Sequence, residues 1–186
     1  MNEAHFELRL PDGSIKLRKD GTTMQFKPSA YMVIEYCESL VFVQDCRTPA
    51  RLQFTGGGVE IGTETPLEAA IREADEEIGA VVSTCRFVGQ FETYEPVHLF
   101  KAVEWTTRSA TKGFHKQPGE VSDIRMIDKQ ILFDISERDR YQPLFYRAQW
   151  KMLGWYLLSC SQVSNIQPPV FKLWSEDPWL ILDSLR

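Results

Sequence analysis

Residues 58–80 read GVEIGTETPLEAAIREADEEIGA, and this stretch decides the fold of the chain. Thr65 can cap a helix, Pro66 suits the first helical position, and Glu68 completes a T-x-x-E capping box. Gly79 supplies the signal at which such a helix stops. The sequence therefore predicts a helix that begins after Thr65 and ends before Gly79.

Apolar side chains recur on this predicted helix at intervals of three and four residues, so they form one narrow stripe. The stripe consists of Leu67, Ala70, Ile71, Ala74 and Ile78. Because such a stripe must face a core, we expect the helix to be docked against the rest of the fold.

Three carboxylates, those of Glu73, Glu76 and Glu77, fall on another face of the helix within an arc of ~100°. Their repulsion would raise their pKa values and destabilise the helix unless cations lie among them. Oxygen-only ligand sets suit Mg²⁺, Mn²⁺ or Ca²⁺, and the first two are the usual partners of phosphate substrates. The pattern therefore indicates a divalent metal site. A solvated helix face would explain the glutamates alone, but not their fixed register with Glu64 and the preceding triple glycine.

Seven residues of this stretch follow the spacing G-x5-E-x7-R-E-x-x-E-E-x-G, which chance would produce at roughly one start position in 10^8 or rarer. They are Gly58, Glu64, Arg72, Glu73, Glu76, Glu77 and Gly79. The pattern resembles the Nudix box, and the chain thereby resembles the Nudix hydrolases. The resemblance implies an α/β fold with a mixed β-sheet sandwiched between α-helices. It also implies hydrolysis of a nucleoside diphosphate linked to another group.

The resemblance implies a role for each charged residue of the box. Glu73, Glu76 and Glu77 would hold Mg²⁺ or Mn²⁺ and act in catalysis, and Arg72 would orient these carboxylates, since it lies four residues before Glu76. Glu120, in the segment GEVSDIRMID, is similar to the family's frequent additional metal ligand or general base. Its alternative role is that of a solvated residue before a strand. Other candidates for the base are Glu92, Glu95 and Glu104.

The triple glycine Gly56-Gly57-Gly58 permits a close approach of the backbone to a metal or a phosphate. We expect the carbonyl of Gly57 to face the metal and Gly58 to contact the substrate. However, Thr63 intervenes between Gly62 and Glu64, where most members of the family have G-E. A one-residue bulge would accommodate Thr63, and it leaves open which glycine carbonyl faces the metal.

The order of predicted elements resembles that of a Nudix core at residues 28–135. Strands are expected at Tyr31–Tyr36, Leu40–Gln44, Cys85–Gln90 and Val97–Val103, with a loop, RTPARLQFTGGG, ahead of the helix. Residues 1–27 are predicted to form an N-terminal β-hairpin and residues 136–186 a C-terminal helical extension, all within a single domain. In that extension, a helix at Leu144–Leu158 is apolar on more than one face. It needs burial under the C-terminal segment SEDPWLILDSLR or against another subunit, so a homodimer is possible.

The charge of the chain is concentrated at the box. The 186 residues carry a net charge of −5, whereas residues 58–80 alone carry −6, so the rest of the chain carries +1. No basic field is left to attract a nucleic-acid polymer, and we expect a small-molecule nucleotide diphosphate derivative as the partner. The sequence shows no membrane span, no secretory signal and no C-x-x-C pair among its four cysteines. These features predict a cytoplasmic protein that does not interact with membranes.

The identity of the substrate is less determined. Pro96 lies sixteen residues past Ala80, as a proline does in ADP-ribose-cleaving relatives, but it could equally begin a strand. A nucleotide sugar or ADP-ribose is slightly favoured over an NTP or dNTP. Arg47 and Arg51, ahead of the glycines, are candidates to clamp a distal phosphate.

Two other activities remain open at this stage. The first is a Nudix-fold nucleotide sensor or interaction module that does not hydrolyse its ligand, although such modules usually lose a box glutamate. The second is diphosphate isomerisation, which would need a cysteine opposite the metal, and Cys46 is the nearby candidate.

Overall fold

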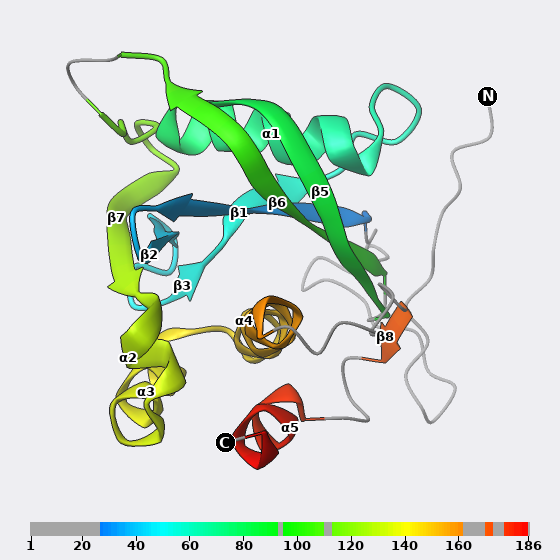
Figure 1. Ribbon diagram of the computed structural model, residues 1–186. Helices are drawn as coiled ribbons and strands as arrows, with labels where there is room; N and C mark the ends of the chain where they lie inside the picture. The colour runs from blue at the N-terminus through cyan, green and yellow to red at the C-terminus, as the bar shows by residue number, and fades with distance from the viewer. Residues whose placement is uncertain (1–26, 93–94, 110–112, 162–169, 173–176, 186) are drawn as a thin grey trace, which may run out of the picture.

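The computed structural model describes residues 27–92, 95–109, 113–161, 170–172 and 177–185. A mixed β-sheet lies between helix α1 on one face and helices α4 and α5 on the other, which confirms the predicted α/β architecture (Figure 1). In chain order the elements are β1 (Ser29–Tyr36), β2 (Ser39–Asp45), β3 (Leu52–Gln53), β4 (Thr55–Gly58), α1 (Pro66–Ile78), β5 (Ala80–Glu92), β6 (Pro96–Thr107), β7 (Val121–Asp128), α2 (Lys129–Phe133), α3 (Ile135–Tyr141), the 3-10 helix η1 (Gln142–Leu144), α4 (Arg147–Cys160), β8 (Val170–Lys172) and α5 (Pro178–Ser184).

The sheet runs in the order β3-β2-β1-β6-β5-β8, with β4 also paired to β1 and β7 also paired to β2. The pairs β1–β6 and β5–β8 are parallel, and the other pairs are antiparallel. The four strands predicted from the sequence are present with longer bounds, and β7 covers the segment that contains the predicted strand after Glu120. Since β1 pairs with β4 through Ser29–Met32 and with β2 through Ile34–Tyr36, the glycine segment continues the sheet beside α1.

Helix α1 begins and ends as the sequence predicts. The Thr65 hydroxyl accepts a hydrogen bond from the Glu68 N–H, and the Glu68 carboxylate accepts one from the Thr65 N–H at 2.7 Å. Pro66 is the first helical residue, and Gly79 ends the helix with a left-handed φ of 68°. The face that packs on the sheet is rich in alanine, through Ala69, Ala70 and Ala74. These small side chains allow α1 to lie close to the sheet, so the helix places its carboxylates next to β4.

The opposite face of the sheet is covered by α4, which is buried along most of its length. Of the two coverings predicted for this helix, the C-terminal helix α5 is the one found. Trp150 of α4 and Trp179 of α5 stack with ring centroids 4.4 Å apart, and Trp179 Nε1 donates to the Trp150 carbonyl at 3.2 Å. The helix begins at Arg147 rather than at Leu144, because η1 occupies the residues that follow Tyr141.

One prediction of secondary structure was wrong, and another lies outside the described residues. The segment at residues 47–58, expected to be a loop, contains β3 and β4. Gly56 makes this pairing possible, because it has a φ of 146° and a Cβ there would lie 2.3 Å from the Ala30 carbonyl oxygen. The hairpin expected within residues 1–27 falls almost entirely outside the described residues. The division of a single domain at residues 28–135 and 136–186 stays a prediction.

The helices and the cysteines bear on the environment in which the protein acts. In the described ranges, every helix is too short or too polar to cross a bilayer. The cysteines Cys37, Cys46, Cys85 and Cys160 are free thiols.

Candidate active site

The glycine strand β4 packs against α1 and brings the backbone close to the box carboxylates. A Cβ at Gly57 would lie 2.7 Å from Glu73 Oε1, so a larger residue there would push the end of the Glu73 side chain away from the strand. The carbonyl oxygen of Gly58 accepts a long hydrogen bond from Arg72 Nη2 at 3.4 Å. Gly57 thus faces the Glu73 carboxylate, and Gly58 is in contact with the arginine.

Glu77 is turned toward β4 and is only 6% exposed. Its Oε2 atom accepts hydrogen bonds from the Thr55 hydroxyl at 2.5 Å and from the Gly56 N–H at 2.9 Å. Burial raises the pKa of Glu77 to about 7 against the lowering by these two hydrogen bonds, and the charges of Glu73 and Glu120 raise the pKa further. The sequence predicted that Glu77 lies on a helix face away from the packed side, and this was wrong. The helical pattern does not reveal the burial, because the hydrogen-bond donors to Glu77 come from strand β4.

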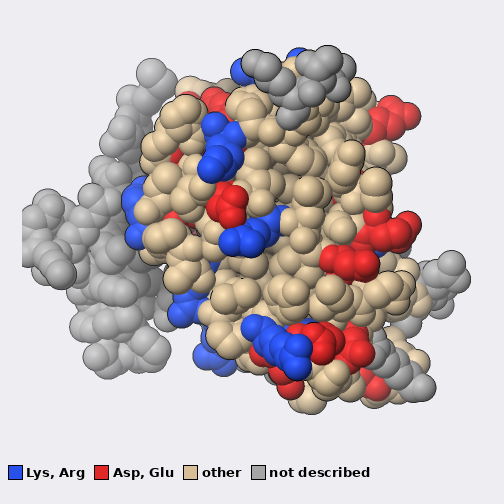
Figure 2. Space-filling view, turned by 90° about the vertical axis from the view of Figure 1, so that its left-hand side faces the viewer, with Lys and Arg blue, Asp and Glu red and all other residues tan. Residues whose placement is uncertain are grey.

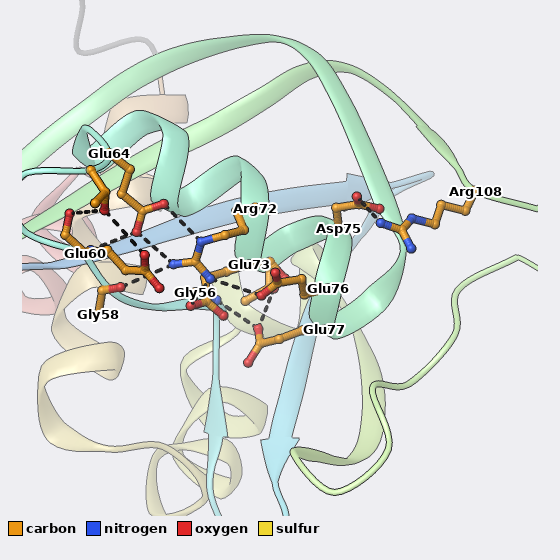
Figure 3. A network of polar contacts seen from close by, with 12 residues as sticks. Gly56, Gly58, Glu60, Glu64, Arg72, Glu73, Asp75, Glu76, Glu77 and Arg108 are labelled. Atoms are coloured by element: carbon orange, nitrogen blue, oxygen red, sulfur yellow. Dashed lines mark hydrogen bonds and ion pairs between the residues drawn. The ribbon is translucent and has the colours of Figure 1, made fainter.

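Arg72 lies at the centre of the remaining box acids (Figure 3). Its Nε and Nη2 atoms donate to the two oxygens of Glu64 at 3.0 and 2.9 Å. Its Nη1 atom donates to Glu73 Oε1 at 2.8 Å and to Glu76 Oε2 at 3.0 Å. The predicted pair of Arg72 with Glu76 is present, and the guanidinium is the cation that separates the negative charges on this helix.

The environments of these carboxylates differ although they share one arginine. The hydrogen bonds from Arg72 lower the pKa of Glu64. Burial raises the pKa of Glu73 despite its contact with Arg72, and the charges of Glu76 and Glu120 add to the increase. Glu64 is therefore the carboxylate most firmly held in its ionised form by the arginine, whereas Glu73 and Glu77 carry unfavourable negative charge.

This excess of negative charge fits a divalent cation. Within the described residues, no group of three or more His, Cys, Asp or Glu side chains is arranged so that it could hold a metal ion as it stands. However, the set consists of carboxylate oxygens, which hard ions such as Mg²⁺ and Mn²⁺ prefer. Both hydrogen bonds to Glu77 use Oε2, which leaves Oε1 for a ligand. One guanidinium also cannot balance Glu64, Glu73 and Glu76 together, so a cation would relieve the repulsion.

Glu120 lies near the same cluster, although it is far away in the sequence. It immediately precedes β7, its N–H donates to the Gln117 carbonyl, and its carbonyl accepts from the Cys46 N–H at 2.7 Å. The Glu120 carboxylate is exposed, and its negative charge contributes to the raised pKa values of Glu73 and Glu77, after burial as the main cause. The role of Glu120 as a fourth acid of the site stays a prediction.

The two loop arginines have different surroundings. Arg47 is paired with Asp45 through Nε and Nη2, at distances between 3.0 and 3.2 Å. Arg51 donates through Nη1 to the carbonyls of Pro143 and Phe145, at 2.6 and 3.0 Å. Neither arginine forms a hydrogen bond with a box acid in the described part of the chain, and Arg51 is bound instead to backbone carbonyls of the C-terminal extension.

Sequence reasoning missed the residues that support Glu77. Thr55 holds the carboxylate, and Tyr31 of β1 is close enough that the charge of Glu77 helps to raise its pKa to about 12, after burial as the main cause. Gln149 of α4 accepts from the Phe54 N–H at 3.1 Å and so fixes the residue before Thr55. Only the position of Thr55 directly before the glycines gave a signal in the sequence.

Comparisons with known proteins agree with this geometry. A family model described as the NUDIX domain matches residues 25–147 of the chain. Among solved structures, the chain is similar to a Nudix hydrolase family member from Chromobacterium violaceum, at 14% identity and a TM-score of 0.56, over 87% of this chain and 88% of the other. It is also similar to a MutT Nudix hydrolase from Burkholderia pseudomallei, at 14% identity and a TM-score of 0.48, over 57% of this chain and 86% of the other. None of the curated proteins compared with the chain matches it.

Proposed function

The chain belongs to the Nudix hydrolase family, whose members are pyrophosphohydrolases, and from this premise we propose that it uses Mg²⁺ or Mn²⁺ to cleave the diphosphate linkage of a nucleotide-type substrate. Water would attack phosphorus and release a nucleoside monophosphate and a phosphorylated second product. The observation that carries the proposal is the position of Glu73 and Glu77 against the glycine strand, with Arg72 bound to both Glu73 and Glu76.

In this proposal Glu73, Glu76 and Glu77 hold the metal, with Glu120 and a glycine carbonyl of β4, that of Gly57, as further ligands. When bound, the ion would neutralise the charge that develops on the phosphates and lower the pKa of the attacking water. Glu120 would also accept the proton of that water as the general base.

The remaining residues of the box orient this set. Thr55 and the Gly56 N–H fix Glu77 Oε2, so the other oxygen keeps one direction. Arg72 holds Glu73 and Glu76 through a single nitrogen and is itself anchored on Glu64 through the other two. The protein thereby supplies position and charge, which are the main requirements of phosphoryl transfer.

A small nucleotide derivative fits the surface better than a nucleic-acid polymer does. On the face drawn in Figure 2, Lys and Arg lie beside Asp and Glu, and no continuous basic area is visible. We favour a nucleotide sugar or ADP-ribose over an NTP or dNTP. Pro96 no longer contributes to this preference, because it is the first residue of β6, a position that suits proline in any sheet. The free thiols agree with a cytoplasmic location, which we include in the proposal.

A sensor that binds but does not cleave nucleotides is the alternative. The presence of every box glutamate favours hydrolysis, because a binding module has no need for this density of carboxylates. The isomerase hypothesis gains no support, since the Cys46 thiol is exposed and it is the backbone N–H of Cys46 that bonds to the Glu120 carbonyl.

A substrate panel tests the proposal. Purified protein is incubated with nucleotide sugars, ADP-ribose, NTPs and dNTPs in Mg²⁺ or Mn²⁺, and released monophosphate is measured. We expect metal-dependent release that Glu76→Gln removes. The matched control is Glu137→Gln on α3, whose carboxylate pairs only with Arg140 and which should retain activity. Binding without release from any member would overturn the hydrolase in favour of the sensor.

A further inference from the structure

A hollow with a volume of about 440 Å³ opens where the loop before β3 meets the start of α4. Its lining includes Arg51, Gln142, Phe145, Tyr146, Arg147 and Trp150. Phe145 and Trp150 are buried, with ring centroids 5.3 Å apart, and they form an aromatic floor. The two arginines and Tyr146 are exposed at its mouth. This volume lies in the range of ordinary small-molecule sites.

The walls of the hollow are tied together by hydrogen bonds. Arg51 Nη1 binds the carbonyls of Pro143 and Phe145, and Leu52 forms a parallel bridge with Phe145. The Thr48 hydroxyl is hydrogen-bonded to the Tyr146 hydroxyl. A ligand that enters the hollow would therefore meet a largely pre-formed surface.

The charge of the lining identifies the class of ligand. The two ionisable groups in it that carry charge at neutral pH, Arg51 and Arg147, are both cationic, in a chain whose net charge is −5. Within the described part of the chain, the Nε and Nη2 atoms of Arg51 make no hydrogen bond. Guanidinium groups offer forked donors that match phosphate oxygens. The lining thus suits a phosphate better than a neutral or cationic group.

The hollow also lies within reach of the box acids. The Cys46 N–H binds the Glu120 carbonyl, and Arg51 is only five residues further along. Five residues span at most roughly 18 Å when fully extended. Two turn hydrogen bonds, from the Thr48 N–H to the Asp45 carbonyl and from the Arg51 N–H to the Thr48 carbonyl, shorten this distance. Tyr146 is also close enough to Tyr31 and to Arg47 to influence their pKa values.

We propose that this hollow binds a phosphate at the end of the substrate that lies away from the cleaved diphosphate linkage. This inference rests on the proposed function and narrows it to diphosphate compounds that carry an additional terminal phosphate. Arg51 and Arg147 hold that phosphate, and the aromatic floor packs against the sugar or chain to which it is attached. Arg47 has no part in the contact, because Asp45 occupies its guanidinium.

Matched substrate pairs that differ by one phosphate test the inference. NADPH with NADH, and coenzyme A with dephospho-coenzyme A, are two such pairs. We expect kcat/KM of the wild type to be at least about tenfold higher for the phosphorylated member of at least one pair. A tenfold difference corresponds to the free energy of one charge-assisted hydrogen bond. Arg147→Gln should reduce this ratio to within about threefold of unity. Arg51→Lys should lower the ratio as well, and its melting temperature reports whether the loop remains folded.

The control is Arg140→Gln, which neutralises an exposed arginine on α3 that pairs with Glu137 outside the hollow. It should leave the wild-type ratio unchanged. Binding of the same pairs to Glu76→Gln protein, measured by calorimetry, separates this inference from the proposed function. If no compound is hydrolysed but NADPH or coenzyme A still binds more tightly than its unphosphorylated partner, the hydrolase proposal fails and the assignment of the hollow as a phosphate-binding site is retained. Equal kcat/KM and equal binding within both pairs, or a ratio that survives Arg147→Gln, would overturn the inference.

Discussion

Replacing the Glu77 carboxylate by an amide should stabilise the metal-free protein at alkaline pH, even though it removes a proposed metal ligand. Burial raises the pKa of Glu77 from 4.5 to about 7. Each pKa unit corresponds to about 1.36 kcal/mol, so the ionised carboxylate costs the folded state roughly 3 kcal/mol. In Glu77→Gln the amide oxygen can still accept from the Thr55 hydroxyl and the Gly56 N–H, so the supporting contacts are kept.

The pH dependence follows from the direction of the shift. Because the pKa is higher in the folded than in the unfolded state, the folded state binds this proton more tightly. The stabilisation by that proton is fully present below pH 4.5 and is lost as the pH rises to about 7. Glutamine does not titrate, so the variant lacks this loss. The gain in free energy of unfolding should be near zero at pH 4.5 and complete above pH 7.

Thermal unfolding in EDTA, followed by circular dichroism from pH 5 to pH 8, measures this gain. For a chain of this size, roughly 3 kcal/mol corresponds to a rise in Tm of at most about 6–12 °C. Saturating Mg²⁺ at about 100 times its Kd should stabilise the wild type by roughly 2.7 kcal/mol and the variant by less. The control is the exposed substitution Glu137→Gln, which should shift Tm little at any pH. A variant that melts at or below the wild-type temperature at pH 8 in EDTA would refute the argument from burial, and an undiminished Mg²⁺ response would refute the role of Glu77 as a ligand.

Three further substitutions test the rest of the site. Glu76→Gln should keep the fold and lower kcat on the order of 10²-fold or more, because a charge that binds the metal is lost at constant volume, and activity within a few-fold of wild type would contradict the assignment. Glu120→Gln should lower kcat at neutral pH more than it weakens Mg²⁺ binding and should alter the acid limb of the pH–rate profile. An unchanged profile would direct the search for the base to Glu92, Glu95 or Glu104. Gly56→Ala should lower Tm far more than Gly62→Ala. Both glycines have a positive φ, but of the two only Gly56 has other atoms where a Cβ would lie. Equal losses of Tm would contradict this argument.

Local signals predicted the fold well. The capping box at Thr65, the stop at Gly79 and the apolar stripe are interactions between residues a few positions apart, so the sequence contains them directly. The strand status of Thr55–Gly58 could not be predicted in the same way, because it depends on the backbone of β1, to which the chain returns from a distance. The covering of α4 likewise needed α5, whose position relative to Trp150 is set by tertiary packing.

In the candidate site too, contacts within one helix could be predicted from the sequence, whereas contacts between different elements could not. The sequence located Glu73, Glu76 and Arg72 and their mutual contacts, since these are neighbours on one helix. It did not reveal the burial of Glu77, because the donors from Thr55 and Gly56 come from another element.

The arrangement of Arg72 explains how one site can be stable without metal and still accept it. Two of its nitrogens are fixed by Glu64, and the Nη1 atom alone contacts both Glu73 and Glu76. A metal ion therefore competes for the hydrogen bonds of one nitrogen only, and the guanidinium does not have to leave its place. Both oxygens of Glu64 are bound by Arg72, so Glu64 fixes the position of the guanidinium. This role accounts for the fixed spacing of Glu64 in the box. The same cation that screens the carboxylates in the metal-free protein would also keep Glu73 and Glu76 oriented for a ligand.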